Sequence, residues 1–392
     1  TVGTGYDQLS VTGNATLGGD LTISEINGFK AAPLNSFTYL TTAGISGDFG
    51  GKRIFPVGYA LPQTTATQQR IGYGDGSTIF FDNYAGNSDW NDASNWSAGF
   101  VPTVGLDVDT ATLISGGTIV ISGGIHEINN LITDSNITNS GGSLVVAGSI
   151  TVPDGFIYTQ DNAAASAQFD GVFNNTLATG VSINNVDGSL DLTGTSNSAS
   201  VNNGLAGTMT IAGLTVADIV NDGSMVIDGS VTGDVTNNGV LSGSGTVTGY
   251  VTNGGEFNPG NSPGTVIVDG DLNLLETSIL NIEIAGLQAG LYDELIVTGN
   301  VLLDGQLNVI VDNTGGYLGA LNDSFNPITY ASSSGEVDLT ATLGYGYSLT
   351  IDQNKLSLIT TLVPGLFIPD VQSDVVTLVD STQSITVIEN VD

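Results

Sequence analysis

Apolar and polar residues alternate in short segments along most of this chain, and Gly, Asn and Asp residues interrupt the segments at close intervals. Residues 9–23 (LSVTGNATLGGDLTI) and 295–311 (LIVTGNVLLDGQLNVIV) show the pattern. Each predicts two short strands joined by a Gly/Asn turn, because a period of two places alternate side chains on opposite faces of a sheet. Almost no stretch has helical spacing, so the pattern predicts an all-β protein.

A long-range repeat divides the chain into modules. Residues 6–23 and 292–309 are two copies of one sequence, with ten of eighteen positions identical at a constant offset of 286. We therefore expect two related β-modules, at residues 1–83 and 285–361. The second copy follows a run-in at 275–291, which is reduced to TVGTG before the first copy. The first module is thus expected to be incomplete at its start.

A shorter repeat lies between the modules. Asn-Asp-Gly begins at Asn221, Asn-Asn-Gly at Asn237 and Asn-Gly-Gly at Asn253, each sixteen residues apart. A period of roughly 16–20 residues suits one coil of a parallel β-helix. Asn tolerates the corner conformation, and its side chain can form hydrogen-bonded ladders from coil to coil. We predict such a solenoid over residues 84–284.

Both tryptophans lie in residues 88–113, a segment rich in turn-forming residues. We favour a hydrophobic cap here, because the first coil of a β-helix has an open edge that needs covering. The alternative is a platform for binding a glycan or a host protein. Its candidate residues are Trp90, Trp96, Tyr84 and Phe100.

Residues 362–392 form a last segment with alternating apolar positions and prolines at 364 and 369. The segment could be an ordinary strand, a linker, or a strand that pairs with the open sheet edge of another copy. End-to-end association would hide open edges at both ends of the chain. The residues expected to take part are Tyr6, Leu9, Val11, Val375, Leu378, Ile385 and Val387.

The charge of the chain excludes several classes of partner. There are 39 acidic and five basic residues, which gives a formal net charge of −34. Such a surface repels phosphate backbones, so nucleic acid is not expected as a partner, and anionic membranes are disfavoured. No run of 18 apolar residues occurs, so we expect no membrane insertion by this chain. Cations, sugars and proteins, including further copies of the chain, are the remaining partners.

Four stretches together resemble the passenger regions of autotransporter and haemagglutinin-type adhesins of Gram-negative bacteria. They are NWSAGFVPTVGLDVDTATL (95–113), the Asn-Asn-Gly coils, EFNPGNSPGTVIVDGDLNL (256–274) and YDELIVTGNVLLDGQLNV (292–309). The resemblance implies an exported, extended right-handed parallel β-helix, placed outside the cell or on the bacterial cell surface. It does not name a ligand.

Candidate catalytic chemistry is sparse. His126 is the only histidine and cysteine is absent, so a nucleophilic triad would depend on His126, in a stretch that reads as a plain strand. Two carboxylate pairs could serve a glycosidase, Asp107 with Asp109 and Asp187 with Asp191. Residues 84–284 contain no Lys or Arg, which disfavours a lyase. We therefore predict no enzyme, with a polysaccharide-degrading β-helix as an alternative.

Oxygen-rich turns make calcium a candidate cofactor. NNVDGSLD (184–191) and DSNITNS (134–140) offer the carboxylate and carbonyl ligands that calcium prefers, although solvated acidic turns are the interpretation we favour. The sequence as a whole predicts a structural subunit of an extracellular fibre or cell-surface adhesin that associates end to end. The alternative is a monomeric adhesin that binds a glycan or a host protein.

Overall fold

The chain is nearly all β. The computed structural model describes residues 5–24, 36–47, 49, 51–55, 63–64, 67–72, 78–81, 83, 85–96, 101–102, 104–110, 117–133, 135–151, 157–175, 183–364, 377–379 and 384–386. Strands make up 63% of the structure and helix 1%, which confirms the predicted class. Two compact units, Thr1–Met209 and Thr210–Asp392, are described separately below.

Unit 1 begins with two stacked turns of chain. The first contains β1 (Leu9–Ser10), β2 (Asn14–Leu17) and β3 (Asp20–Ser24), and the second contains β4 (Ser36–Thr41), β5 (Gly44–Gly47) and β6 (Gly51–Phe55). Parallel pairing joins β1 to β4, β2 to β5 and β3 to β6. A hairpin of β7 (Gln63–Thr64) and β8 (Gln68–Gly72) closes this module, with β8 antiparallel to β4.

A parallel β-helix follows in unit 1. Its elements are β9 (Thr78–Phe80), η1 (Ala93–Asn95), β10 (Val104–Asp109), β11 (Thr118–Ile121), β12 (Ile125–Ile132), β13 (Asn136–Asn139), β14 (Ser143–Val146), β15 (Ile150–Thr151), β16 (Tyr158–Phe169), β17 (Val172–Asn175), β18 (Ile183–Leu192) and β19 (Thr195–Ile211). Each strand pairs in parallel with its equivalent in the next coil, as Ile119 does with Ile137 and Phe169 with Leu192. Alternate side chains are buried, as the period of two predicts.

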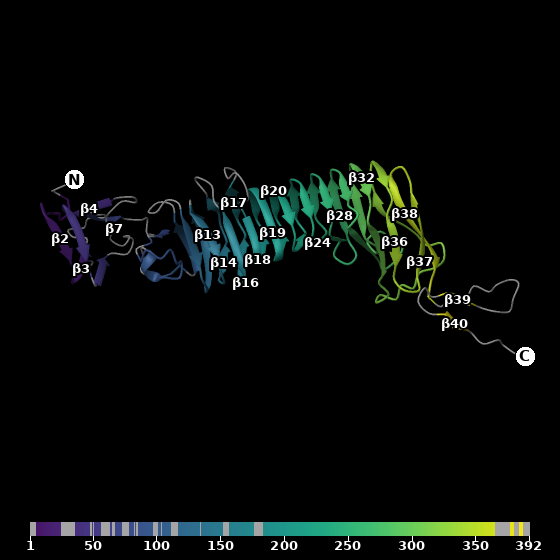
Figure 1. The fold of residues 1–392 in the computed structure, drawn as a ribbon, viewed down its shortest axis with the longest axis horizontal. Coiled ribbons are helices and arrows are strands. Elements are labelled where there is room, and N and C mark those ends of the chain that lie inside the picture. Colours follow the sequence, from purple (N-terminus) through teal and green to yellow (C-terminus); the bar gives the residue numbers. More distant parts are fainter. Residues whose placement is uncertain are drawn as a thin grey trace, which may run out of the picture. The chain divides into compact units, whose positions relative to one another are not determined.

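The solenoid of unit 2 is more regular (Figure 1). Its strands are β20 (Leu214–Asn221), β21 (Ser224–Ile227), β22 (Ser230–Thr232), β23 (Val235–Asn237), β24 (Val240–Gly243), β25 (Thr246–Thr248), β26 (Val251–Asn253), β27 (Glu256–Pro259), β28 (Thr265–Asp269), β29 (Leu272–Leu274) and β30 (Ile279–Ile284). Val235 pairs with Val251 and Asn237 with Asn253, which is the sixteen-residue period read from the sequence. The parallel β-helix is therefore confirmed.

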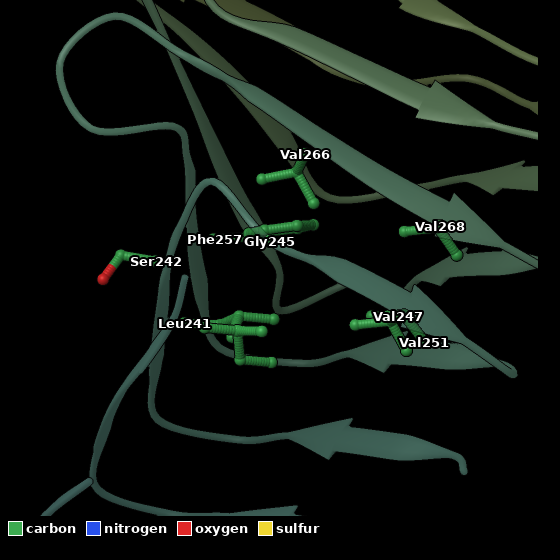
Figure 2. Close-up of a pocket in the computed structure, with 9 residues that line it drawn as sticks. Leu241, Ser242, Gly245, Val247, Val251, Phe257, Val266 and Val268 are labelled. Carbon is green, nitrogen blue, oxygen red and sulfur yellow. The ribbon is translucent and has the colours of Figure 1, made fainter. Parts of the chain in front are cut away.

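The interior of this solenoid is filled by stacked aliphatic and aromatic side chains. Figure 2 shows one small gap near Phe257, lined by Leu241, Val247, Val251 and Val268 among others. The lining is almost wholly apolar, and these side chains are buried. The gap is therefore an imperfection in the packing of the core and offers no polar group to orient a ligand.

An amide ladder runs through one buried corner of the coils in unit 2. Asn221 donates from Nδ2 to Oδ1 of Asn237, and Asn237 donates to Oδ1 of Asn253, both at 2.6 Å. All three side chains are fully buried. Each also donates to backbone carbonyls, as Asn237 does to Glu256 at 3.0 Å. The ladder lets polar groups lie in the core because each finds partners in the neighbouring coil.

The second copy of the long repeat continues the same stacking. Its strands are β31 (Glu294–Val297), β32 (Asn300–Leu303), β33 (Gln306–Val311), β34 (Ser324–Thr329), β35 (Ser332–Gly335) and β36 (Asp338–Ala341). They pair in parallel with the preceding coil and with each other. The predicted boundary at 284/285 thus falls inside continuous stacking, because a duplicated sequence need not be a separate folding unit. A hairpin of β37 (Gly346–Ile351) and β38 (Lys355–Leu362) closes the module, with β38 antiparallel to β34.

The amide ladder gives a stability prediction. Replacing Asn237 with Ala leaves buried amide and carbonyl groups of two neighbouring coils without partners, at about 1–3 kcal/mol each. We expect Asn237→Ala to lower the free energy of unfolding by roughly 3 kcal/mol, measured by urea denaturation. Asn238→Ala is the matched control, because that exposed side chain donates only to Asp222 Oδ1. Equal losses for the two variants would contradict the role of the ladder.

Candidate functional site

The candidate site is the uncovered side of the first coil, formed by β1, β2 and β3. The two repeat copies are alike in structure as well as in sequence: β2 and β32, and β3 and β33, begin at the offset of 286 found in the sequence. Both modules place three strands parallel to the next turn and end in an antiparallel hairpin. The second copy is therefore a template for the first.

The template shows which neighbour would stack before the first coil. In the second copy, β31, β32 and β33 stack on β28, β29 and β30 of the preceding coil. In the first copy, within the described residues, β1, β2 and β3 pair only with β4, β5 and β6. Among these described residues one backbone edge of each strand therefore has no partner, and an open parallel edge is a ready template for a further strand.

The inward side chains of the first coil are correspondingly uncovered. Leu9 is 60% exposed, whereas its equivalent in the second copy, Leu295, is fully buried. Leu21 and Ile23 in β3 are only half-buried. The equivalents of these two residues are Leu307 and Val309, which are fully buried, together with the other inward positions of β31 to β33. The end of the first coil therefore presents core-type side chains to its surroundings.

The tyrosine of the repeated Tyr-Asp pair has the same role in both copies. Tyr6 packs edge-on against Phe37, with ring centroids 5.2 Å apart, and Tyr292 packs against Phe325 in the same way at 5.5 Å. This contact joins two turns within each module. Tyr6 is thus already engaged inside its own module.

The aspartate of the pair differs between the copies. Asp293 is 2% exposed and accepts backbone amides from Gly264 at 2.8 Å and from Glu283 at 2.7 Å. Both donors belong to the coil before the second module. Asp7, the equivalent in the first copy, is exposed. The sequence analysis did not single out Asp7 and Asp293 as site residues, although the same aspartate occurs at this position in both copies of the repeat.

Burial also changes the acidity of Asp293. It raises the pKa of this carboxyl from 3.8 to about 6, although the amides of Glu283 and Gly264 partly oppose the shift and the charge of Glu283 adds to it. Asp293 and Glu283 border a small polar cavity with Asn258, Asn281 and Ser262. The carboxylate thus ties the loop at 260–264 and β30 to the second module.

Part of the C-terminal tail is described. β39 (Thr377–Val379) and β40 (Ser384–Thr386) form an antiparallel pair, with Leu378 opposite Ile385. Val375 and Val387, the other two tail residues predicted to self-associate, lie outside the described residues. Self-association of Tyr6, Leu9 and Val11 with these tail residues stays a prediction.

Trp90 and Trp96 lie together in the interior at the start of the unit 1 solenoid. Their rings meet edge-on at 4.6 Å, and Nε1 of Trp96 donates to the carbonyl oxygen of Trp90 at 2.6 Å. Both are fully buried. A sugar stacks on an exposed ring face, and neither ring has one, so the platform interpretation does not fit these two residues. Tyr84 and Phe100 lie outside the described residues.

His126 is buried beside this aromatic pair. Its Nδ1 lies 3.1 Å from the carbonyl oxygen of Pro102, and its Nε2 lies 2.9 Å from that of Gly123. The ring is 5.8 Å from Trp90. Both ring nitrogens therefore face backbone carbonyls, and the side chain is buried in the core.

The carboxylates considered for catalysis make structural contacts. Asp107 Oδ1 accepts hydrogen bonds from the amides of Asn129 and Asn130, both at 2.8 Å. Asp109 is buried in β10. Asp187 accepts the backbone amide of Gly188 at 2.8 Å, and Asp191 is half-buried in β18. The contacts of Asp107 join β10 to β12, and the contact of Asp187 holds a turn within β18.

Calcium binding stays a prediction. In the part of the chain that the structure describes, no group of three or more His, Asp or Glu side chains is placed to hold a metal ion. Several acidic turn residues instead bond to the next coil, as Asp234 does by accepting the amide of Tyr250 at 2.8 Å.

Comparison with models of known protein families finds no match to the chain, and comparison with curated proteins also finds none. The likeness to adhesin passenger regions therefore rests on the motifs quoted above. No helix in the described residues is long and apolar enough to cross a membrane.

The acidity of Asp293 predicts a pH dependence. The folded chain holds this proton up to about pH 6, whereas the unfolded chain releases it near 3.8. The group therefore contributes stability that is present below about pH 4 and is lost as the pH rises to about 6. We expect the fall in the free energy of unfolding across this range, measured in urea, to be smaller in Asp293→Asn.

Asp312→Asn is the control. Hydrogen bonds from the Thr314 amide and hydroxyl lower the pKa of the Asp312 carboxyl, so its removal leaves the fall between pH 4 and 6 in place. The same slope in Asp293→Asn and in the unmodified chain would show that the buried carboxylate does not titrate in this range.

Proposed function

We propose that this chain is a structural subunit of an extracellular fibre or cell-surface adhesin, and that copies associate end to end through open β edges. The observation that carries the proposal is the uncovered first coil, where Leu9 is exposed while Leu295 is buried by a preceding coil. Burying such an end removes apolar surface from water and pairs free backbone groups.

Two further features fit a structural role. The coils are joined by continuous parallel backbone pairing, which makes a solenoid resistant to bending and local unfolding. A net charge of −34 keeps copies apart where their sides meet, while end contacts use apolar side chains and neutral backbone. The placement outside the cell rests on the resemblance of the motifs to adhesin passenger regions.

The proposal predicts that a charge at the open end prevents association. Burying a leucine contributes about 1.5–3 kcal/mol, so Leu9→Glu is expected to weaken association about tenfold or more. Sedimentation velocity over a range of concentrations, at about 0.15 M salt to screen repulsion, measures the effect. Negative-stain electron microscopy of the same samples shows whether fibres form.

Leu205→Glu is the matched control. Leu205 is 87% exposed and lies away from the first coil in the sequence, so the same added charge there should leave association unchanged. Single chains at every concentration of the unmodified protein would overturn the proposal and favour a monomeric adhesin. Equal weakening by both variants would point to general charge repulsion.

A further inference from the structure

We propose that residues 384–390 of a second copy add to β3 as a parallel strand, in the place that β30 occupies beside β33. The inference rests on the proposed end-to-end association and names the segment that makes the joint. Its starting point is the template relation between the two modules, in which β33 and β3 are equivalent strands.

The tail segment resembles the strand that it would replace. Residues 384–390 read SITVIEN, and residues 278–284, which contain β30, read SILNIEI. Ser, two Ile residues and Glu are identical at four of the seven positions.

The template fixes the register of the joint. In the second module Leu280 pairs with Leu307, and Ile282 pairs with Val309. Transferred to the joint, Thr386 faces Leu21 and Ile388 faces Ile23. Ile388 would then cover Ile23, which is only half-buried in the described chain.

The tail is able to donate an edge. In the described residues, β40 pairs with β39 along one edge only. The second edge of a strand can bond to a new partner while the first pairing persists, which is how a β-strand adds to an exposed sheet. The hairpin of β39 and β40 therefore need not open before it docks on β3.

The exposed aspartate of the first module gains a partner in this arrangement. Asp293 accepts the amide of Glu283 in the second module at 2.7 Å. The equivalents of these residues are Asp7 and Glu389. The joint therefore places the Glu389 amide against the Asp7 carboxylate, a charge-assisted hydrogen bond that a single described copy does not make.

Disulfide cross-linking tests the register, because the chain contains no cysteine. The pair equivalent to Asn308 and Asn281, whose side chains bond at 2.9 Å, is Thr22 and Val387. Chains carrying Thr22→Cys are mixed with chains carrying Val387→Cys and oxidised. We expect a linked dimer whose joining peptides, identified by mass spectrometry, contain positions 22 and 387.

Thr22→Cys mixed with Glu389→Cys is the matched control. Position 389 lies on the same face of the strand as position 387 but about 6.6 Å further along it. A disulfide between positions 22 and 389 would therefore need movement of the backbone. We expect at least tenfold less linked dimer from this mixture. Equal yields from the two mixtures would overturn the register.

Sedimentation of the same mixtures separates the two proposals. Chains that assemble without the link between positions 22 and 387 would overturn the strand assignment and leave the proposed function standing. A link that forms within a chain carrying both cysteines, and not between chains, would also overturn it. Unmodified chains that never assemble would overturn the proposed function itself.

Asp7→Ala tests the proposed contact between the Asp7 carboxylate and the Glu389 amide. The side chain is exposed in the single copy, so its removal should leave thermal unfolding of the unassembled chain unchanged. We expect association to weaken several-fold, because the Glu389 amide loses its acceptor. Asp20→Ala, in an exposed position of the same coil, should have no such effect. Equal effects of the two variants would contradict the contact.

Discussion

Stacking of each coil in register on the next is the constraint on which the rest of the structure depends. A strand of a parallel solenoid satisfies its backbone amides and carbonyls only through neighbours on both sides. Buried polar side chains also depend on both neighbouring coils, because Asn237 accepts a hydrogen bond from Asn221 on one side and donates one to Asn253 on the other. A coil is therefore complete only when both of its neighbours are present, and a coil at the end of the stack is left with unpaired backbone groups.

The first and last turns of the stacks differ in what covers them. In both modules an antiparallel strand lies on the last turn, β8 on β4 and β38 on β34, and this occupies one edge that a further parallel strand would need. The start of the unit 1 solenoid is filled by the Trp90 and Trp96 rings. The first coil, β1 to β3, has no comparable covering among the described residues. This asymmetry supports the proposed contact, in which the first coil of one copy meets the donor strand of another.

Much of the solenoid could be predicted from the sequence, because coil stacking imposes a visible period. The asparagines at 221, 237 and 253 mark both the corner and the ladder. The closing hairpins were not predicted, since alternation is the same in parallel and antiparallel strands. Asp293 was also missed: its repetition as Asp7 was a signal, but its role depends on amides distant in sequence, which the repeat does not identify. The tryptophan segment left two interpretations open until burial of both rings was known.

The acidic charge and the stacking are linked. Asp218 accepts the amide of Asp234, and Asp234 accepts that of Tyr250, so carboxylates at one turn bond to the backbone of the next coil. Like charges thus follow one another along the solenoid, and each is partly offset by an amide dipole. Two solenoids side by side would bring such rows together with few basic residues between them, whereas the proposed end-to-end contact would be made mainly by backbone groups and apolar side chains. The acidic residues that fasten the coils are therefore compatible with the proposed end-to-end association and oppose contact between the sides of two solenoids.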